Sequence, residues 1–395
     1  MGLSVLSIDE MVASVEQDVI AWRRHLHEHP EVSFQEVATA QFVYDLLSTF
    51  PNLTLTRPTK TSVIARLVGA RPGKVLALRA DMDALPIEEE NDVPYRSKNP
   101  GAMHACGHDG HTAMLLGAAK ILAQHQADIA GEIVFVFQHA EELLPGGAAE
   151  LVEKGVLRGV DAVVGQHLWQ PVPSQTIGLR AGAVMAAPDT FYITIIGKGG
   201  HAAQPHLNVD PIAIGAQVVT NLQHVASRLT DPLEPFVLSV TKFVGGTADN
   251  VIPGSVEMCG TVRTFKDELR DEAAVWMERI IRGVTEAHGA SYQFVYEKGY
   301  RPVVNDEQVT AFVREVLQEA FGEDVVTPTA PTMGGEDFSA YQTVAPGTFF
   351  FTGIQNEEKG IVYPHHHPRF DIDEDALRVG VKAFVAIALR FGDRD

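Results

Sequence analysis

The sequence is short of cysteine, positive charge and long apolar runs. Its 395 residues include only 2 cysteines, too few for a disulfide framework, so we expect a reducing compartment. There are 31 Lys and Arg residues against 51 Asp and Glu, and the resulting formal net charge of −20 argues against nucleic-acid binding. No apolar run approaches the roughly 20 residues of a membrane span, and residues 1–17 lack the basic start of a secretory signal. We therefore expect a cytoplasmic protein with neither a nucleic-acid nor a membrane partner.

Two common catalytic motifs are also missing. No glycine-rich nucleotide fingerprint follows an expected strand, and there is no G-x-S-x-G turn. These absences argue against a nucleotide-dependent redox enzyme and against a serine hydrolase. The hydrophobic content of 45% and charged content of 21% are typical of a globular protein, and the length suits more than one domain.

Short apolar runs alternate with helical stretches through the first half of the chain. Two helices are expected within residues 8–50, interrupted near Pro30, and a third at Thr112–His125. Continuous apolar runs predict buried strands at Val75–Arg79, Ile133–Gln138 and Ala162–Gln166. This alternation predicts an α/β fold with a mixed, largely parallel sheet and helices on both faces.

The middle of the chain has a different pattern. Strands and helices are expected there in the order β-α-β-β-α-β, which is the order of a ferredoxin-like unit. The corresponding ranges are Phe191–Ile196, Pro211–Leu229, Phe236–Phe243, Ser255–Thr264, Glu268–His288 and Tyr292–Lys298. We therefore predict a ferredoxin-like α+β domain at 184–298, inserted into a catalytic domain made of 1–183 and 299–395.

Polar side chains follow three expected strands of the larger domain. Asp81 and Asp83 follow the first, His139, Glu141 and Glu142 follow the second, and His167 follows the third. In open α/β sheets ligands bind outside the carboxyl ends of the strands, so these groups are expected to converge on one crevice.

Several of these residues suit metal-assisted hydrolysis. Cys106 and His108, expected in the loop before the Thr112 helix, are a thiolate and an imidazole that suit a divalent ion. Of the adjacent pair Glu141 and Glu142, one can bind metal while the other takes a proton from water. Each motif also has a structural alternative: a buried cysteine beside surface histidines, a solvated acidic loop, a core histidine at His167, and a surface cluster at His365–His367.

Taken together, the motifs resemble the amidohydrolase branch of the aminoacylase/carboxypeptidase metallopeptidases, nearly from end to end. That branch includes hippurate hydrolases, auxin-conjugate hydrolases and N-acetyl-diaminopimelate deacetylases. The segments that carry the resemblance are RRHLHEHPEVSFQE (23–36), LRADMDALPIEE (78–89), MHACGHDGHTAMLLGAA (103–119), FQHAEE (137–142), GQHLW (165–169), GKGGHAAQPH (197–206), DNVIPGSVEMCGTVRTF (249–265), MGGEDFS (333–339) and HHHPRFDID (365–373).

The resemblance implies a role for individual residues of the catalytic domain. Two divalent metal ions per subunit are expected, Zn²⁺ or Mn²⁺ first, with Co²⁺ and Ni²⁺ as alternatives. Glu141 matches the general base and Asp83 the carboxylate that orients the site. His365 stands where the family pattern usually has Leu, so His365 and His367 are alternatives to His366. The implied ligands are Cys106, His108, Glu142, His167 and His366.

The inserted domain resembles the family's lid and dimerisation domain, which implies a homodimer or higher homo-oligomer. His201 matches a lid histidine that reaches the partner's active site in relatives, and Asn250 and Arg263 match positions that contact the substrate. The implied activity is hydrolysis of the amide bond of N-acyl-L-amino acids. The alternatives are a dipeptidase or carboxypeptidase on the same scaffold and a non-catalytic metal-binding protein.

Overall fold

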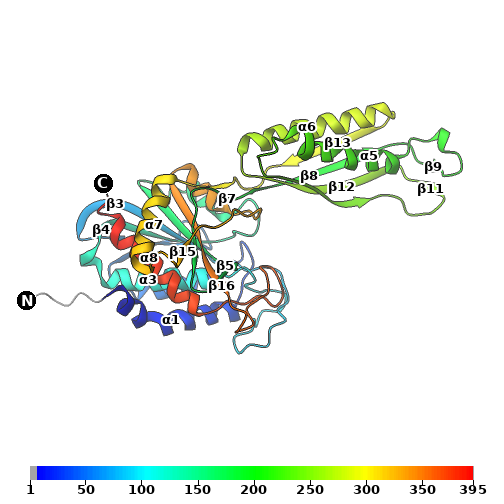
Figure 1. The fold of residues 1–395 in the computed structure, drawn as a ribbon. Helices are drawn as coiled ribbons and strands as arrows, with labels where there is room; N and C mark the ends of the chain where they lie inside the picture. The colour runs from blue at the N-terminus through cyan, green and yellow to red at the C-terminus, as the bar shows by residue number, and fades with distance from the viewer. Residues whose placement is uncertain (1–6, 395) are drawn as a thin grey trace, which may run out of the picture. The chain divides into compact units, whose positions relative to one another are not determined.

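A computed structural model describes residues 7–394 of the chain. It divides into two compact units (Figure 1). The first, which we call the main unit, consists of Met1–Val184, Val304–Ala330 and Asp337–Asp395. The second, which we call the inserted unit, consists of Met185–Val303 and Pro331–Glu336. Within residues 7–394, no helix combines the length and apolar character needed to cross a bilayer.

The main unit is built on an eight-stranded mixed sheet with the order β1-β2-β4-β3-β5-β16-β6-β15. Its centre is parallel, because β3 pairs in parallel with both β4 and β5, and β5 pairs in parallel with β16. The strands are β1 (Leu53–Thr56), β2 (Val63–Val68), β3 (Arg71–Asp81), β4 (Ala130–Gln138), β5 (Ala162–Pro173), β6 (Ile177–Gly178), β15 (Val326–Thr327) and β16 (Gly347–Gln355). The predicted mixed, largely parallel sheet is confirmed.

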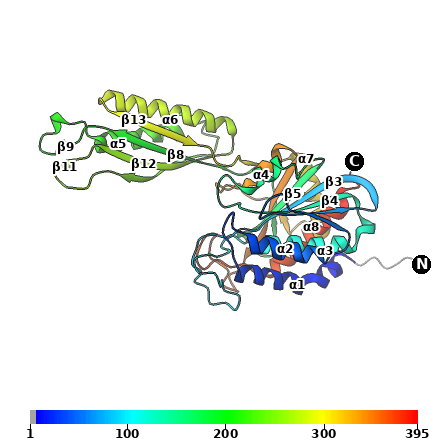
Figure 2. The same cartoon turned by 180° about the vertical axis from the view of Figure 1, so that it is seen from behind.

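Helices cover both faces of this sheet (Figure 2). Alternate residues of β3 and β4, including Leu78 and Phe135, join the apolar core formed with the helices of one face. The intervening residues, Arg79 and Gln138, face the opposite layer, where Gln138 donates to Asp337. The core face carries α1 (Ile8–Glu28), α2 (Val37–Ser48), α3 (His108–Gln124), α7 (Glu307–Phe321) and α8 (Asp375–Phe391); the other carries α4 (Gly147–Glu153) and the short helix Asp337–Thr343.

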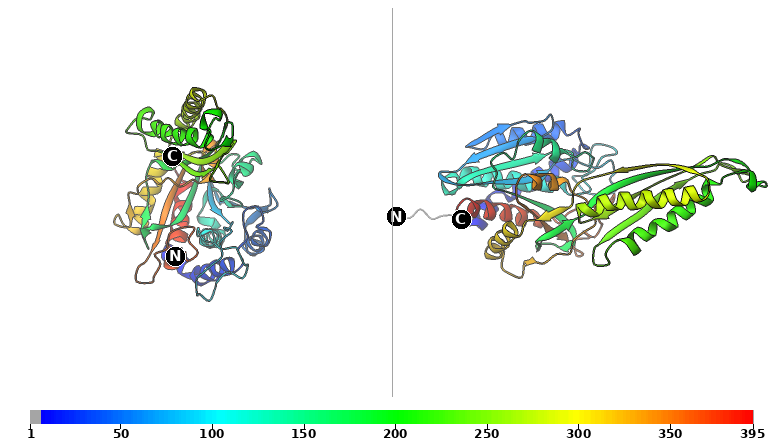
Figure 3. Two further views of the ribbon diagram at one scale, coloured as in Figure 1. Left: turned by 90° about the vertical axis from the view of Figure 1, so that its right-hand side faces the viewer. Right: turned by 90° about the horizontal axis from the view of Figure 1, so that it is seen from above.

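The inserted unit has a four-stranded antiparallel sheet with the order β10-β12-β8-β13. This is the ferredoxin-like arrangement that the β-α-β-β-α-β pattern predicts. Its helices α5 and α6 lie side by side on one face of the sheet (Figure 3) and enclose an apolar core. The elements are β8 (Ala187–Ile196), α5 (Pro211–His224), β10 (Phe236–Val244), β12 (Ser255–Thr264), α6 (Asp267–Ala287) and β13 (Ser291–Glu297).

Two short strand pairs complete the described fold. In the inserted unit, β9 (Gly200–His201) pairs with β11 (Val251–Ile252). Near the ends of the insertion, β7 (Gly182–Met185) pairs with β14 (Val303–Asn305). A later segment, Pro331–Glu336, belongs to the inserted unit although it lies outside the predicted range 184–298. It is held there by a bridge between Met185 and Thr332 and by the hydrogen bond from the amide of Ala186 to the carbonyl of Gly334.

Candidate active site

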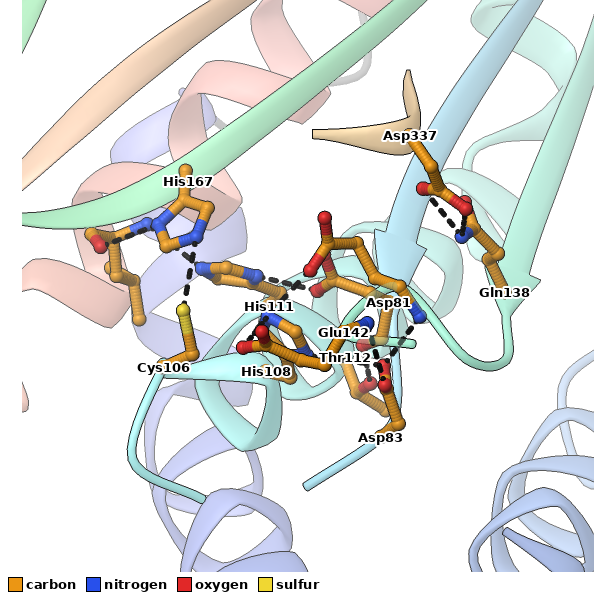
Figure 4. A network of polar contacts seen from close by, with 12 residues as sticks. Asp81, Asp83, Cys106, His108, His111, Thr112, Gln138, Glu142, His167 and Asp337 are labelled. Carbon is orange, nitrogen blue, oxygen red and sulfur yellow. Dashed lines mark hydrogen bonds and ion pairs between the residues drawn. The ribbon is translucent and has the colours of Figure 1, made fainter. Parts of the chain in front are cut away.

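Most of the predicted polar residues of the main unit converge at the carboxyl ends of its central strands (Figure 4). β3 ends at Asp81 and β4 ends at Gln138, so the chain leaves both strands at the same edge of the sheet. The acidic loop His139–Glu142 and the start of α3 meet at this edge, as the position of ligand sites in open α/β sheets predicts.

Cys106 and His108 are brought together by a turn at Gly107. Gly107 is the N-terminal capping residue of α3 and has φ +88, a conformation that glycine adopts without steric cost. The expectation that both residues lie in a loop is wrong for His108, which is the first residue of α3. Sequence spacing did not reveal this, because the helix starts with glycine and acidic and histidine residues rather than with apolar ones.

Asp83 connects the two halves of the site. Its Oδ1 accepts hydrogen bonds from Nδ1 of His108 at 3.3 Å and from the backbone amide of Glu141 at 3.0 Å. Its Oδ2 accepts from the backbone amide of Glu142 at 3.0 Å and from the hydroxyl of Ser33 at 2.6 Å. The buried carboxylate thus holds the acidic loop beside the start of α3.

Three of the sets of possible ligand atoms in residues 7–394 share members here, and within each set the atoms lie within 4.8 Å of one another. Cys106, His108 and His167 form one set, Cys106, Glu142 and His366 form a second, and His108, Glu141 and Glu142 form a third. Cys106 and Glu142 each appear in two sets, so the groups are contiguous. Thiolate, imidazole and carboxylate together suit borderline divalent metals such as Zn²⁺ and Mn²⁺.

His167 lies within a strand rather than after one, because β5 continues to Pro173. The continuation was not evident from the sequence, because Gln166, His167 and Gln170 interrupt the apolar pattern and Pro171 and Pro173 are unusual in a strand. Nδ1 of His167 donates to the carbonyl of Leu168 at 2.7 Å, so in the neutral ring Nε2 carries the lone pair. That nitrogen is 3.6 Å from the sulfur of Cys106. Burial is the largest cause that keeps the pKa of His167 well below its usual value, and nearby His111 lowers this pKa further.

The histidine triplet 365–367 directs its members to different neighbours. Nε2 of His366 lies 3.3 Å from Oε1 of Glu142, and the amide of His366 donates to the carbonyl of Ala105 at 2.8 Å. His365 instead accepts the amide of Gln170 through Nε2 at 3.2 Å, and the ring of His367 stacks on Tyr363. Only His366 joins a set of possible ligand atoms among the described residues.

The electrostatics of the cluster favour a cation. Burial lowers the pKa of His108, but Asp81, Asp83 and Glu142 outweigh burial and raise it to about 10. Burial and the carboxylates of Glu142 and Glu141 raise the pKa of Cys106 well above its usual value. Within residues 7–394, buried Nε2 of His108 and Oε1 of Glu142 have no hydrogen-bond partner in good geometry. A divalent ion would compensate these groups and stabilise the thiolate, so the residues fit a metal.

The residues predicted in the inserted unit fall into two places. His201 is in β9, opposite Val251 of β11, and the carbonyl of the neighbouring Asn250 accepts the amide of Ala202 at 3.0 Å. Both side chains are exposed. Arg263 lies near the other end of β12, opposite Pro188, and donates to Oγ1 of Thr261 at 3.0 Å and to the carbonyl of Met333 at 3.2 Å. The structure therefore brings His201 and Asn250 together but not Arg263.

Sequence reasoning missed a buried polar network behind the site. Arg79 donates to Asp81 at 2.7 Å and to Asp337 at 3.0 Å, and Asp81 also accepts from His111 at 2.6 Å. Burial raises the pKa of Asp337 to about 6, although Arg79 opposes the shift. The sequence contains one indication of this network: Arg79 lies inside an apolar strand, and a buried charge needs partners. All of these residues lie within the quoted motifs, but their contacts join distant segments.

Comparison with known proteins places this fold and site in a family. A model described as peptidase family M20/M25/M40 matches residues 77–390. The YXEP protein of Bacillus subtilis, described as a dinuclear metal-binding peptidase of family M20, has a solved structure with a TM-score of 0.84 and 37% identity. That alignment covers 96% of this chain and 99% of that one. The fold and the clustered ligand atoms are thus those of a dinuclear metallopeptidase-type hydrolase.

Two relatives with named activities support the same family assignment. An N-acyl-L-amino acid amidohydrolase of Geobacillus stearothermophilus is 65% identical over 301 residues, or 76% of this chain and 81% of that protein. Thermostable carboxypeptidase 1 of Saccharolobus solfataricus is 41% identical over 386 residues, or 97% of this chain and 98% of that protein. The chain belongs to peptidase family M20/M25/M40. It is a metal-dependent hydrolase of amide bonds, and the expected family resemblance is confirmed.

Proposed function

We propose that this enzyme hydrolyses the amide bond of N-acyl-L-amino acids. The observation that carries the proposal is the joint presence of a candidate base, Glu141, and a complete candidate ligand set in one contiguous cluster. The 65% identity to an N-acyl-L-amino acid amidohydrolase favours this substrate class over others in the family.

Five side chains would hold two divalent metal ions: Cys106, His108, Glu142, His167 and His366. When bound, the ions supply Lewis-acid activation of the scissile carbonyl and lower the pKa of a bound water. We propose Zn²⁺ or Mn²⁺ as the physiological metal, with Co²⁺ and Ni²⁺ as alternatives, because thiolate, imidazole and carboxylate accept all four. Both cysteines are free thiols, which fits action in the cytoplasm.

We assign different roles to the two glutamates of the acidic loop, Glu141 and Glu142. Both glutamates share the set with His108, but of the two only Glu142 also joins the set with Cys106 and His366. In our proposal Glu141 takes a proton from the attacking water and delivers it to the leaving amine. Asp83 keeps the two residues in place through their backbone amides.

The inserted unit would supply substrate contacts. Arg263 is half-buried and held by Thr261 and Met333, and its remaining N–H groups suit the free carboxylate of the substrate. His201 would stabilise the oxyanion, and Asn250, which lies beside it, would contact the substrate. His201 lies beyond the Ser255 end of β12, and the step from Ser255 to Arg263 is about eight residues, or roughly 26 Å. One inserted unit does not bring both to the same substrate, which supports a homodimer with shared sites.

A substrate panel tests the activity. Enzyme loaded separately with Zn²⁺, Mn²⁺, Co²⁺ or Ni²⁺ would be given N-acetyl- and N-benzoyl-amino acids, their carboxyl-amidated forms, and unblocked dipeptides. We expect hydrolysis of the N-acyl-amino acids and a large rise in KM when the carboxylate is amidated. Preferential cleavage of unblocked dipeptides would contradict the proposal.

Carboxypeptidase activity is the second candidate, favoured by the 41% identity to a thermostable carboxypeptidase over nearly the whole chain. The same catalytic groups would serve, since both reactions cleave an amide next to a residue with a free carboxylate. N-blocked dipeptides added to that panel distinguish the two, because a carboxypeptidase releases the C-terminal residue from them efficiently.

A further inference from the structure

Both ring nitrogens of His111 are engaged in hydrogen bonds, although His111 lies between two candidate ligands. Its Nε2 accepts the backbone amide of Leu168 at 2.8 Å, and its Nδ1 is 2.6 Å from Oδ1 of Asp81. An amide N–H only donates, so Nε2 must be unprotonated and Nδ1 must carry the hydrogen that Asp81 accepts. The contacts therefore assign one neutral tautomer to His111.

Asp81 is itself held in position. Its Oδ2 accepts from Arg79 at 2.7 Å, and its backbone carbonyl accepts the hydroxyl of Thr112, the residue after His111, at 2.7 Å. Arg79, Asp81 and His111 are each at most 1% exposed. A buried, fully directed network of this kind leaves the imidazole of His111 one orientation.

The other end of the chain of contacts reaches His167. The peptide unit that follows His167 donates its N–H to His111, and the carbonyl of Leu168 accepts from Nδ1 of His167 at 2.7 Å. The rings of His111 and His167 also meet edge to face, with centroids 4.5 Å apart. His111 thus contacts the ring of His167 and holds the adjoining residue, whose carbonyl sets the tautomer of His167.

We propose that His111 is a positioning residue that keeps His167 in the orientation and tautomer required to bind metal through Nε2. The proposal rests on the proposed metal role of His167. Carbonyl and carboxylate partners of this kind commonly orient metal-binding histidines, and their loss costs about 10–100-fold in metal affinity.

The opposite assignment, His111 as a ligand, conflicts with its contacts. Asp81, His108 and His111 do form a set of possible ligand atoms within 4.8 Å. For Nε2 of His111 to bind metal, however, the buried amide of Leu168 would lose its acceptor, and a buried unpaired donor is unfavourable. Binding through Nδ1 would remove the hydrogen bond to Asp81 that Arg79 supports.

Three substitutions separate these possibilities. His111→Gln places an amide oxygen where Nε2 accepts Leu168, His111→Asn places an amide nitrogen where Nδ1 donates to Asp81, and His111→Leu provides neither. His125→Leu, at the other end of the same helix, is the matched control. Metal affinity is measured by competition titration with a chromophoric chelator, and Co²⁺ absorption reports the thiolate contact of Cys106.

We expect His111→Leu and His111→Asn to lose about 10–100-fold in affinity for one of two metal ions. We expect His111→Gln to stay within about threefold of the wild type and the control to be unchanged. Equal losses in His111→Gln and His111→Leu would overturn the proposal in favour of a specific need for imidazole. Wild-type affinity in His111→Leu would overturn it in favour of a packing role.

A measurement on the unsubstituted protein keeps the proposal testable if His111→Leu does not fold. Two-bond ¹⁵N–¹H correlation spectra of the histidine-labelled chain report each ring tautomer, and the signal absent from His111→Gln identifies His111. We expect the Nδ1–H form; the Nε2–H form or an imidazolium would refute the proposal. Neither measurement involves substrate, so failure of the N-acyl-amino acid assignment would leave these results unaffected.

Discussion

Oδ1 of Asp83 accepts the backbone amide of Glu141 at 3.0 Å. The other oxygen of the same carboxylate accepts the amide of Glu142 at the same distance. One buried side chain therefore positions the backbone of both the proposed base, Glu141, and a proposed ligand, Glu142. This relationship links the end of β3 to the loop after β4, two segments that are far apart in sequence.

Replacing Asp83 by Asn tests this link. An amide has one acceptor oxygen, so its nitrogen would face a backbone N–H and leave that buried donor unpaired. We expect the free energy of unfolding to fall by about 1–3 kcal/mol and metal affinity to fall with it. Urea unfolding and chelator competition measure the two effects. The exposed Asp92→Asn serves as a control, and equal behaviour of the two variants would contradict the assignment.

Removing the carboxylate of Glu141 tests the proposed base. Gln has a similar shape but takes no proton, so Glu141→Gln should lower kcat by at least about 10²–10⁴-fold with little change in KM. Metal content should remain that of the wild type, because the proposed ligands are untouched. Glu150→Gln, in nearby α4, is the matched control. Near-normal turnover of metal-loaded Glu141→Gln would exclude the assignment.

The element order and the converging loops were predictable because strand ends follow directly from sequence pattern. Runs of apolar residues marked β3 and β4, and the polar residues immediately after them had to meet at one edge of the sheet. The ferredoxin-like order of the inserted unit was predictable for the same reason, since its strands and helices are local. In the family motifs, Cys106 and Glu142 could be proposed as ligands before any contact was known.

The contacts between distant segments were not predictable in this way. In the sequence, nothing distinguishes His111 from the other histidines of the HACGHDGH segment. Its hydrogen bond with the amide of Leu168 depends on the packing of α3 against β5. Asp337 meets Arg79 across 258 residues of sequence. Helical periodicity also failed at His108, where the first turn is polar because it faces the site rather than the core.

Mixing two inactive variants tests whether sites are shared between subunits. His201 lies beyond the Ser255 end of β12 and Arg263 lies near the other end of that strand, so a shared site would take His201 from the partner. Glu141→Gln and His201→Ala should each be nearly inactive alone. After joint unfolding and refolding, the mixed dimer should regain a substantial fraction of wild-type activity, because one of its two sites combines the intact residues. No recovery, with mixed dimers verified by mass, would indicate sites built within one chain.

Stability should depend on pH through His27, which lies buried between two carboxylates. Its Nδ1 is 2.8 Å from Asp109 and its Nε2 is 3.1 Å from Glu89, contacts that favour a cationic ring donating to both carboxylates, while Nη2 of Arg23 also lies 3.3 Å from Nδ1. Burial and Arg23 lower the pKa of His27, but hydrogen bonds to Asp109 and Glu89 outweigh them and raise it to about 9. Tyr95 meets the ring edge-on and His104 lies nearby.

Because the folded pKa of His27 is raised, its contribution is complete below the unfolded value of about 6.5 and is lost as pH rises through about 9. The shift corresponds to about 3 kcal/mol. We expect the stability advantage of the wild type over His27→Gln, measured by urea unfolding, to shrink by this order between pH 6.5 and 9.5. His125→Gln should show no such trend. An advantage that stayed constant over this range would mean that His27 is neutral in the folded protein.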